Sequence, residues 1–269
     1  VVQQATAQVL NRIYEPLFSE HSYGFRPNRS CHQAINQALD YLNAGYEWVV
    51  DFDIEKYFDT VNHDKLISIL REQVNDSATL HLIRSFLKSG VMEGGFVSAT
   101  TEGVPQGGCI SPILSNIYLD KLDKELESRE LRFVRYADDF DIFVKSERSA
   151  DRVMASVSRW LESKLRLKVS ATKTKVVRPT KSVFLGFTFW KSTRGWECRP
   201  TDAAKEKLET KVKQVLVRKR ATAQPMSYIF TKLNQVIRGW VNYYHIGSMA
   251  TYLRDVFGPW LRHKVRVVI

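Results

Sequence analysis

The chain of 269 residues has few cysteines and no long apolar run, and each shortage excludes a class of protein. Its three cysteines, Cys31, Cys109 and Cys198, lie far apart and form no CxxC pair, which argues against a zinc ribbon and a disulfide scaffold. The best apolar stretch, residues 183–190, is much shorter than the roughly 18 residues of a membrane helix. We therefore expect reduced thiols and no membrane partner.

The chain also lacks two features of a complete secreted protein. It does not begin with Met, and its first residues lack the basic-then-apolar pattern of a signal peptide. Both ends look cut from something longer, since the last three residues are apolar. The composition, 44% hydrophobic and 26% charged, argues against wholesale disorder.

Charge is distributed unevenly. Residues 1–144 carry 13 basic and 21 acidic side chains, whereas residues 145–269 carry 27 basic and 8 acidic ones, within a net charge of +11. So basic a half implies a polyanionic partner, most simply a nucleic acid. A solvated basic surface and an anionic membrane are the alternatives. The spread of basic residues among aromatic ones over more than a hundred positions argues against a membrane-bound helix.

Hydrophobic periodicity predicts an α+β body followed by basic helices. Helices are expected over residues 1–18, 30–42, 63–74, 76–89, 112–128 and 149–165, and again from about 200 to the end. Strands are expected over 47–54, 133–145 (as strand–turn–strand), 167–178 and 183–190, with a hairpin over 93–101. A change in composition near 194–200 predicts the domain boundary.

Two groups of aspartates stand in apolar surroundings. Asp51 and Asp53 end one predicted strand, and Asp138 and Asp139 occupy the turn of a predicted hairpin. Adjacent carboxylates between hydrophobic strands are costly unless water or a cation neutralises them. An exposed turn would explain one pair. If the two strand ends meet, the carboxylates form the kind of site that two-metal phosphoryl transfer requires.

Five motifs, in order, carry a family resemblance. They are residues 23–27 (Tyr-Gly-Phe-Arg-Pro), 50–59 (Val-Asp-Phe-Asp-Ile-Glu-Lys-Tyr-Phe-Asp), 103–108 (Gly-Val-Pro-Gln-Gly-Gly), 136–139 (Tyr-Ala-Asp-Asp) and 184–187 (Phe-Leu-Gly-Phe). Together they resemble the reverse transcriptase of bacterial group II introns. Residues 238–244 (Arg-Gly-Trp-Val-Asn-Tyr-Tyr) resemble the maturase, or thumb, segment of that family. The resemblance covers essentially the whole chain.

The resemblance implies a right-hand polymerase fold. Residues 1–45 would form partial fingers, 46–195 a palm with some fingers elements, and 196–269 an α-helical thumb. The implied activity is RNA-directed DNA polymerisation with two Mg²⁺ ions, for which Mn²⁺ can substitute. The implied partners are group II intron RNA, an RNA template/DNA primer duplex and deoxynucleoside triphosphates, in a bacterial cytoplasm. The oligomeric state is left open.

The resemblance also implies roles for single residues. Asp53 resembles the first metal-binding aspartate, with the carbonyl of Ile54 as an added ligand, Asp138 resembles the second, and Asp139 its less directly ligating neighbour. Asp51 is interpreted as supporting these residues without binding metal.

Nucleotide contacts are implied for four residues. The ring of Phe58 would lie under the incoming sugar and exclude a 2′-hydroxyl, unless Phe58 is simply core. Gln106 would touch the nascent base pair, and Gly107, like Gly108, would allow close backbone approach. Lys173 matches a cation near the pyrophosphate leaving group, although a solvated lysine is an alternative.

Primer and template contacts are implied for a larger set. Phe184, Leu185 and Gly186 resemble the primer grip, which an ordinary buried hairpin would also explain. Basic residues expected to contact the duplex backbone are Arg26, Arg29, Lys211, Lys213, Arg218, Lys219 and Arg220. The aromatic stripe around Trp240 is interpreted as core.

Family members usually carry further fingers residues before the position of Val1, and without them polymerase activity would be in doubt. Two other functions therefore stay open at this point. One is a splicing factor that binds RNA without copying it, and the other is a related reverse transcriptase used in defence or spacer acquisition. Residues 238–244 favour the intron family.

Overall fold

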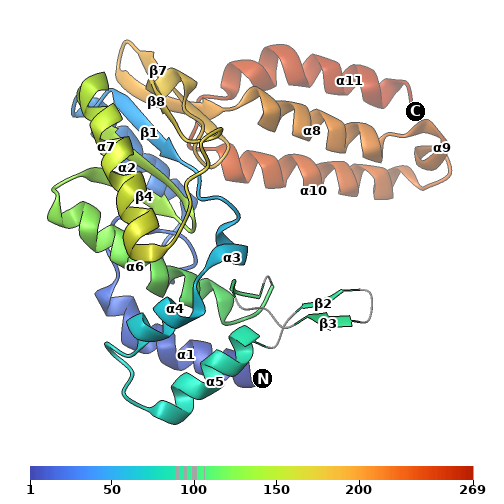
Figure 1. The fold of residues 1–269 in the computed structure, drawn as a ribbon. Helices are drawn as coiled ribbons and strands as arrows, with labels where there is room; N and C mark the ends of the chain where they lie inside the picture. Colours follow the sequence, from blue (N-terminus) through green and yellow to red (C-terminus); the bar gives the residue numbers. More distant parts are fainter. Residues whose placement is uncertain (89–90, 94–95, 99–101, 106, 269) are drawn as a thin grey trace. The chain divides into compact units, whose positions relative to one another are not determined.

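The computed structural model describes residues 1–88, 91–93, 96–98, 102–105 and 107–268. It contains two compact units, Val1–Arg178 and Pro179–Ile269 (Figure 1). The division falls before the boundary expected near 195, because hairpin β7 (Phe187–Ser192)–β8 (Gly195–Pro200) belongs to the second unit. The expected palm segment, 46–195, is therefore not one compact body.

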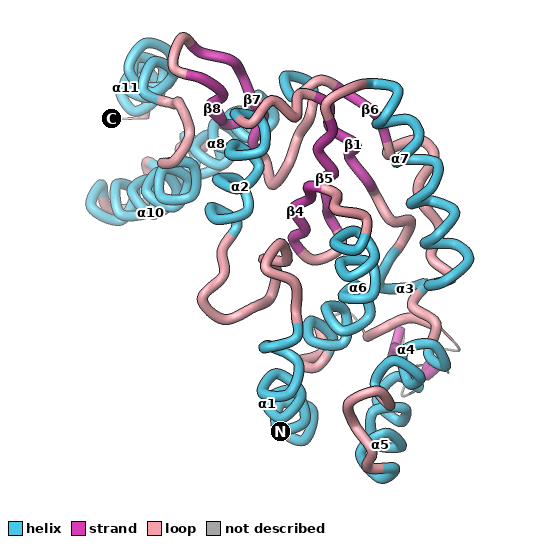
Figure 2. The backbone as a smooth tube through the Cα atoms, turned by 90° about the vertical axis from the view of Figure 1, so that its left-hand side faces the viewer, coloured by secondary structure: helices cyan, strands magenta, loops and turns pink. Residues whose placement is uncertain are grey.

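A four-stranded antiparallel sheet organises the first unit. Its strand order is β4 (Arg132–Tyr136), β5 (Asp139–Val144), β1 (Trp48–Phe52) and β6 (Lys175–Val177). Helix α2 (Cys31–Asn43) lies on one face, while α6 (Ser111–Ser128) and α7 (Glu147–Trp160) lie on the other (Figure 2). Because both faces are covered, the strands are buried along most of their length.

The first unit has further helices, turns and strands outside this sheet. They are α1 (Val2–Tyr14), a 3₁₀ turn (Glu15–Leu17), α3 (Tyr57–Thr60), α4 (His63–Leu70), α5 (Ser77–Lys88), β2 (Val91–Glu93), β3 (Phe96–Ser98) and a π-helical turn (Leu161–Leu165). A second 3₁₀ turn (Pro179–Lys181) begins the second unit. The hairpin expected over 93–101 corresponds to the paired strands β2 and β3, and residues 94–95 and 99–101 of the expected range lie outside the described residues.

Local sequence signals explain the main helix boundaries. Ser30 caps α2 in a reciprocal capping box with Gln33, as its position before the helix predicted. Pro112 lies in the first turn of α6, where its missing N–H costs nothing. Helix α6 is buried on most of its surface because it packs between α1, α4 and β4.

The second unit contains the β7–β8 hairpin and helices α8 (Asp202–Val215), α9 (Arg218–Ala221), α10 (Met226–Tyr244) and α11 (Gly258–Arg266), with a π-helical segment (Tyr252–Phe257). Leu208 and Val212 of α8 pack with Ile229 and Leu233 of α10. Trp240 packs against this cluster and donates a hydrogen bond to the Ala204 carbonyl (3.1 Å). It is therefore partly buried against the core, while Phe230 of the same predicted stripe is exposed.

Two sequence expectations for strands were wrong. The strand expected over 167–178 is only Lys175–Val177, and no strand was expected at Gly195–Pro200, where β8 lies. The polar ends of β8 concealed its alternating burial. Among the described residues, no helix has both the length and the apolarity needed to cross a bilayer.

Candidate functional site

The ends of two strands bring the predicted aspartates together. In the register of β1 and β5, Asp51 faces Asp141 and Phe52 faces Phe140. The rings of Phe52 and Phe140 stack with centroids 4.7 Å apart and planes 7° apart. Continuing this register by one residue places Asp53 beside Asp139. The stacked pair thus locks the strand end that carries Asp53 against the turn that carries Asp138 and Asp139.

The electrostatics of Asp139 report this convergence. Burial, together with the negative charges of Asp51, Asp138 and Asp53, raises its pKa to about 7. A carboxyl that is desolvated and surrounded by negative charges is stabilised by binding a proton or by a nearby cation. The arrangement therefore suits a hard divalent ion, which prefers carboxylate oxygens.

The carboxylates are not gathered into one coordination sphere. Within the described part of the chain, no group of three or more His, Cys, Asp or Glu residues has a metal-holding arrangement. Lys173 instead holds Asp53, with its Nζ 3.2 Å from Oδ2. A metal ion at Asp53 would have to replace this ammonium group.

Backbone contacts fix Asp53 and its neighbour Ile54. The amide of Asp53 donates to Thr174 Oγ1 (3.2 Å), and its carbonyl accepts from the amide of Ser170 (2.9 Å). Ile54 is buried and forms a bridge with Val169. Asp51 lies two residues before Asp53, and Lys175 Nζ lies 3.3 Å from its Oδ2. Burial nevertheless raises the pKa of Asp51.

The turn between β4 and β5 is supported from within the protein. Ala137 has a φ of +61°, a conformation that favours glycine. Its carbonyl accepts a 2.8 Å hydrogen bond from Arg135, whose side chain is fully buried. Asp123 accepts two hydrogen bonds from the same guanidinium, at 2.7 and 2.5 Å. Burial disfavours the charge of Arg135, yet Asp123 keeps its pKa above the usual value.

The loop 21–24 supports the same turn from behind. It extends the sheet beside β4, since the amide of Tyr23 donates to the Arg135 carbonyl (2.9 Å). Gly24 lies so close to the turn that a Cβ there would be 2.3 Å from the Ala137 nitrogen. Asn116 joins both parts, donating to the Gly24 carbonyl (2.9 Å) and accepting from Arg135 (3.2 Å).

Phe58 and the glycine loop lie together. The amide of Val104 donates to the Phe58 carbonyl (2.6 Å), and Gly103, with φ +95°, leaves no room for a Cβ beside it. Phe58 is half-buried and packs against the main core. Gly107 has φ +83° and open space around it, so its backbone conformation requires glycine here. Gln106 lies outside the described residues.

The expected contact of Arg26 with a nucleic acid backbone is wrong. The Arg26 side chain is only 4% exposed, forms an ion pair with Glu15 (3.0 Å) and donates to the carbonyls of Ser19 and Ser22. It therefore fastens the loop after α1 and is closed to a nucleic acid. Arg29 is more exposed and is paired with Glu20.

In the second unit, residues 184–186 form a tight turn against α10. Leu185 and Gly186 have φ values of +51° and +80°, and the Leu185 carbonyl accepts from the Tyr243 hydroxyl (2.9 Å). A Cβ on Gly186 would lie 2.6 Å from the Tyr244 hydroxyl oxygen. Because Phe184 is fully buried, only the backbone and Leu185 of this turn remain to contact a primer.

The remaining predicted contacts lie on or near α8. Lys211, Lys213, Arg218 and Lys219 are exposed, and the side chain of Arg220 is outside the described part of the structure. Lys211 and Lys207 line a groove of about 370 Å³ with Gly239, Trp240 and Tyr243 of α10.

Sequence reasoning missed the residues that support the turn between β4 and β5. Arg135, Asp123 and Asn116 were not singled out, and Gly24 was noted only as part of a motif. One signal was available: Arg135 interrupts the apolar run of β4, and a buried arginine requires a partner. Nothing local in the sequence identifies Asp123 as that partner.

Comparison with known proteins agrees with this geometry. Residues 1–189 match the family described as reverse transcriptase (RNA-dependent DNA polymerase), so the chain belongs to that family. Residues 205–269 match the group II intron, maturase-specific domain. The chain is therefore of the group II intron reverse transcriptase/maturase type, as the resemblance implied.

Two curated relatives show the extent of the similarity. Protein YkfC of Escherichia coli (strain K12) is 33% identical over 225 residues, 69% of this chain and 59% of that protein. Group II intron-encoded protein LtrA of Lactococcus lactis subsp. cremoris is 40% identical over 135 residues, 50% of this chain and 22% of that protein. The chain thus spans less than two thirds of either relative.

Solved structures support the fold. Telomerase from Candida tropicalis, in complex with a TWJ fragment of telomeric RNA, matches 98% of this chain and 50% of its own, with a TM-score of 0.56 and 14% identity. The α+β class with a polymerase-type arrangement is therefore confirmed.

Proposed function

We propose that this chain is the polymerase core of a group II intron protein that copies RNA into DNA. The observation that carries the proposal is the convergence of Asp53 and Asp138 on the carboxyl of Asp139, whose pKa is raised to about 7 by burial and by the surrounding negative charges. A substrate phosphate approaches such a site only if cations neutralise it.

Two Mg²⁺ ions, or Mn²⁺ in their place, are the cations we propose, and Asp53, Asp138, Asp139 and the Ile54 carbonyl would hold them. When bound, they would activate a primer 3′-hydroxyl and stabilise the departing pyrophosphate. The protein contributes position, because the Phe52–Phe140 stack and Arg135 hold the strand end and the turn before substrate arrives.

Other residues would select and hold the substrates. Phe58, beside the glycine loop, would exclude a 2′-hydroxyl and so favour deoxynucleoside triphosphates. Lys173, released from Asp53, would meet the pyrophosphate. The exposed lysines of α8 would follow the template/primer backbone without reading its sequence.

A second role is favoured by one specific finding. The match of residues 205–269 to the maturase-specific domain supports binding of intron RNA and assistance to splicing. It also favours an intron protein over a defence-associated relative. The bacterial cytoplasm is proposed on the relatives from E. coli and L. lactis, while others are mitochondrial.

Primer extension on an RNA template with Mg²⁺ and deoxynucleotides tests the polymerase. We expect Asp138→Ala with Asp139→Ala to abolish extension, and the remote surface variant Asp151→Asn to retain it. Absence of extension by the unmodified chain, with intron RNA binding intact, would favour the splicing role without polymerisation.

A further inference from the structure

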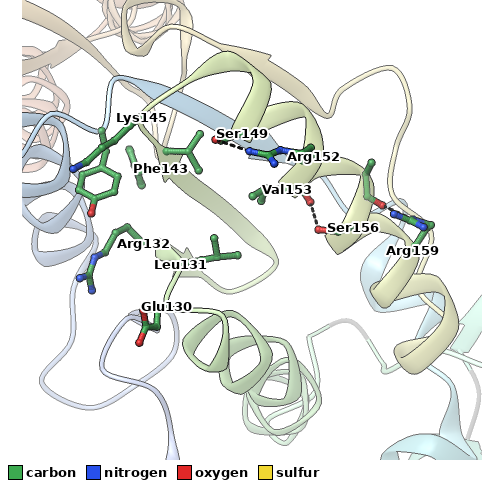
Figure 3. A pocket seen from close by; sticks show the side chains of 13 residues that line it. Glu130, Leu131, Arg132, Phe143, Lys145, Ser149, Arg152, Val153, Ser156 and Arg159 are labelled. Carbon is green, nitrogen blue, oxygen red and sulfur yellow. Dashed lines mark hydrogen bonds between the residues drawn. The ribbon is translucent and has the colours of Figure 1, made fainter.

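A groove on the first unit lies away from the proposed catalytic site. It is enclosed by α7, the start of β4 and the end of β5, with a volume of about 680 Å³ (Figure 3). Lys145 at its edge follows Asp139 by six residues along β5. At about 3.3 Å per residue, the groove is roughly 20 Å from the catalytic turn.

The groove combines an apolar floor with a basic rim. Leu131 and Val153, both partly exposed, form the accessible floor, and Phe143, only 1% exposed, lies beneath it. The basic residues that line it are Arg132, Lys145, Arg152 and Arg159. Glu130 is the single carboxylate among the lining residues described.

These four cations have no ion-pair partner among the described residues, although a hydrogen bond with Tyr46 and the nearby charge of Glu130 raise the pKa of Arg132. Arg152 donates to the Arg148 carbonyl and Ser149 Oγ, Arg159 donates to the Ala155 carbonyl, and Lys145 Nζ lies 5.0 Å from the Tyr46 ring centroid. Elsewhere in the unit many surface cations are paired, as in Lys121–Glu72, Arg84–Asp64 and Arg129–Glu125.

The local excess of positive charge is not a property of the whole unit. Residues 1–178 carry 23 basic and 24 acidic side chains. Helix α7 itself contains Glu147 and Asp151, but neither lines the groove. The acidic residues of α7 thus lie away from the groove, while Arg152 and Arg159 make its groove-facing side basic.

We propose that this groove binds a single-stranded segment of RNA, with phosphates on the rim and an unpaired base on the floor. Arginine forks match phosphate oxygens, and unstacked bases bury their faces on apolar or aromatic side chains. A duplex would reach only the rim. The inference rests on the proposed function for its RNA partner, yet it assigns that partner a surface separate from catalysis.

Photocrosslinking with the full chain tests the proposal. The probe is a 12-nucleotide uridine RNA containing 4-thiouridine, and crosslinked peptides are mapped. We expect crosslinks in residues 130–159. Arg152→Gln with Arg159→Gln should reduce them about tenfold and lower the slope of log affinity against log salt by about 1.4, at 0.7 per phosphate contact.

A matched control removes the same charge outside the groove. Arg148→Gln with Lys164→Gln should leave these crosslinks unchanged, since neither residue lines the groove. Equal loss in both variants would overturn the proposal in favour of general charge attraction. If no RNA crosslinks form in the groove and polyglutamate binds there instead, the proposal is overturned in favour of an acidic protein partner.

Primer extension separates this inference from the proposed function. On a short pre-annealed RNA/DNA duplex, the groove variant should extend at the rate of the unmodified chain. Extension by that chain without groove crosslinks would refute the groove alone. Crosslinks without extension would refute the polymerase and leave the groove standing.

Discussion

Gly24→Ala tests whether loop 21–24 holds the turn between β4 and β5, which carries the proposed catalytic residues Asp138 and Asp139, in position. The added Cβ would lie 2.3 Å from the Ala137 nitrogen and 3.0 Å from the Tyr136 carbonyl carbon. Both atoms belong to backbone, so no side chain can rotate away. Either the loop or the turn that carries Asp138 must move.

The size of the displacement follows from ordinary contact distances. Non-bonded heavy atoms rest about 3.5 Å apart, so the segments must separate by about 1 Å. Misplacement of a reacting group by that amount costs about 100-fold in rate. Overpacking adds about 1–3 kcal/mol of destabilisation. We therefore expect a folded but slow enzyme.

Single-turnover primer extension with pre-bound primer, run beside thermal unfolding, measures both effects. Gly45→Ala is the matched control, because Gly45 has φ +88° but open space around it. It should lose about 1 kcal/mol from backbone strain and keep its rate of extension. The comparison separates positioning of the turn from loss of stability.

Two results would refute this reasoning. A folded Gly24→Ala variant that extends within threefold of the unmodified rate would show that the turn does not depend on the loop. An equal loss of rate in Gly45→Ala would show that stability alone sets the rate.

Three further predictions concern single side chains. Asp123→Asn leaves the Arg135 guanidinium buried without its carboxylate and should cost about 3–5 kcal/mol of unfolding free energy by urea titration; an unchanged midpoint would contradict it. Burial and Asp123 raise the pKa of Asp120 to about 6, so the fold loses stability as the pH rises from about 4 to about 6, and the loss is complete above about 6. Asp120→Asn should therefore add up to about 3 kcal/mol at pH 8 and nothing below about pH 4. Phe58→Ala should raise ribonucleotide relative to deoxynucleotide incorporation about tenfold or more, while Phe58→Tyr, which keeps the ring, should not.

Local signals predicted most of the first unit. The capping box at Ser30 and the apolar strands around the aspartates are short-range patterns, and they correspond to α2, β1, β4 and β5. The convergence of Asp53 with Asp139 was also predictable, because two strand ends rich in carboxylates suggested one site. Its register could not be predicted, since it depends on the pairing of Phe52 with Phe140 across 88 residues.

Long-range contacts explain what the sequence could not show. The motif at 184–187 and the segment 238–244 were recognised separately, yet the structure joins them through Tyr243, Tyr244 and Gly186. Arg26 was expected to contact a nucleic acid backbone, and only the fold reveals Glu15 and two carbonyls around it. Partner identity is a property of topology, which residue type and spacing do not encode.

The buried Arg135–Asp123 ion pair supports the β4–β5 turn, which has no glycine at position 137 where φ is positive. A glycine at position 137 would adopt the positive φ without strain, but it would leave the turn free to move. Alanine there costs about 1 kcal/mol, and the strained conformation persists only because surrounding groups determine it. Arg135 supplies that determination by donating to the Ala137 carbonyl, and Asp123 keeps the arginine charged and oriented. A hydrophobic pair of similar volume would pack at least as stably, yet it offers no donor to the turn. The pair is therefore best understood as holding two carboxylates in place before the substrate arrives, which is where preorganisation lowers a barrier.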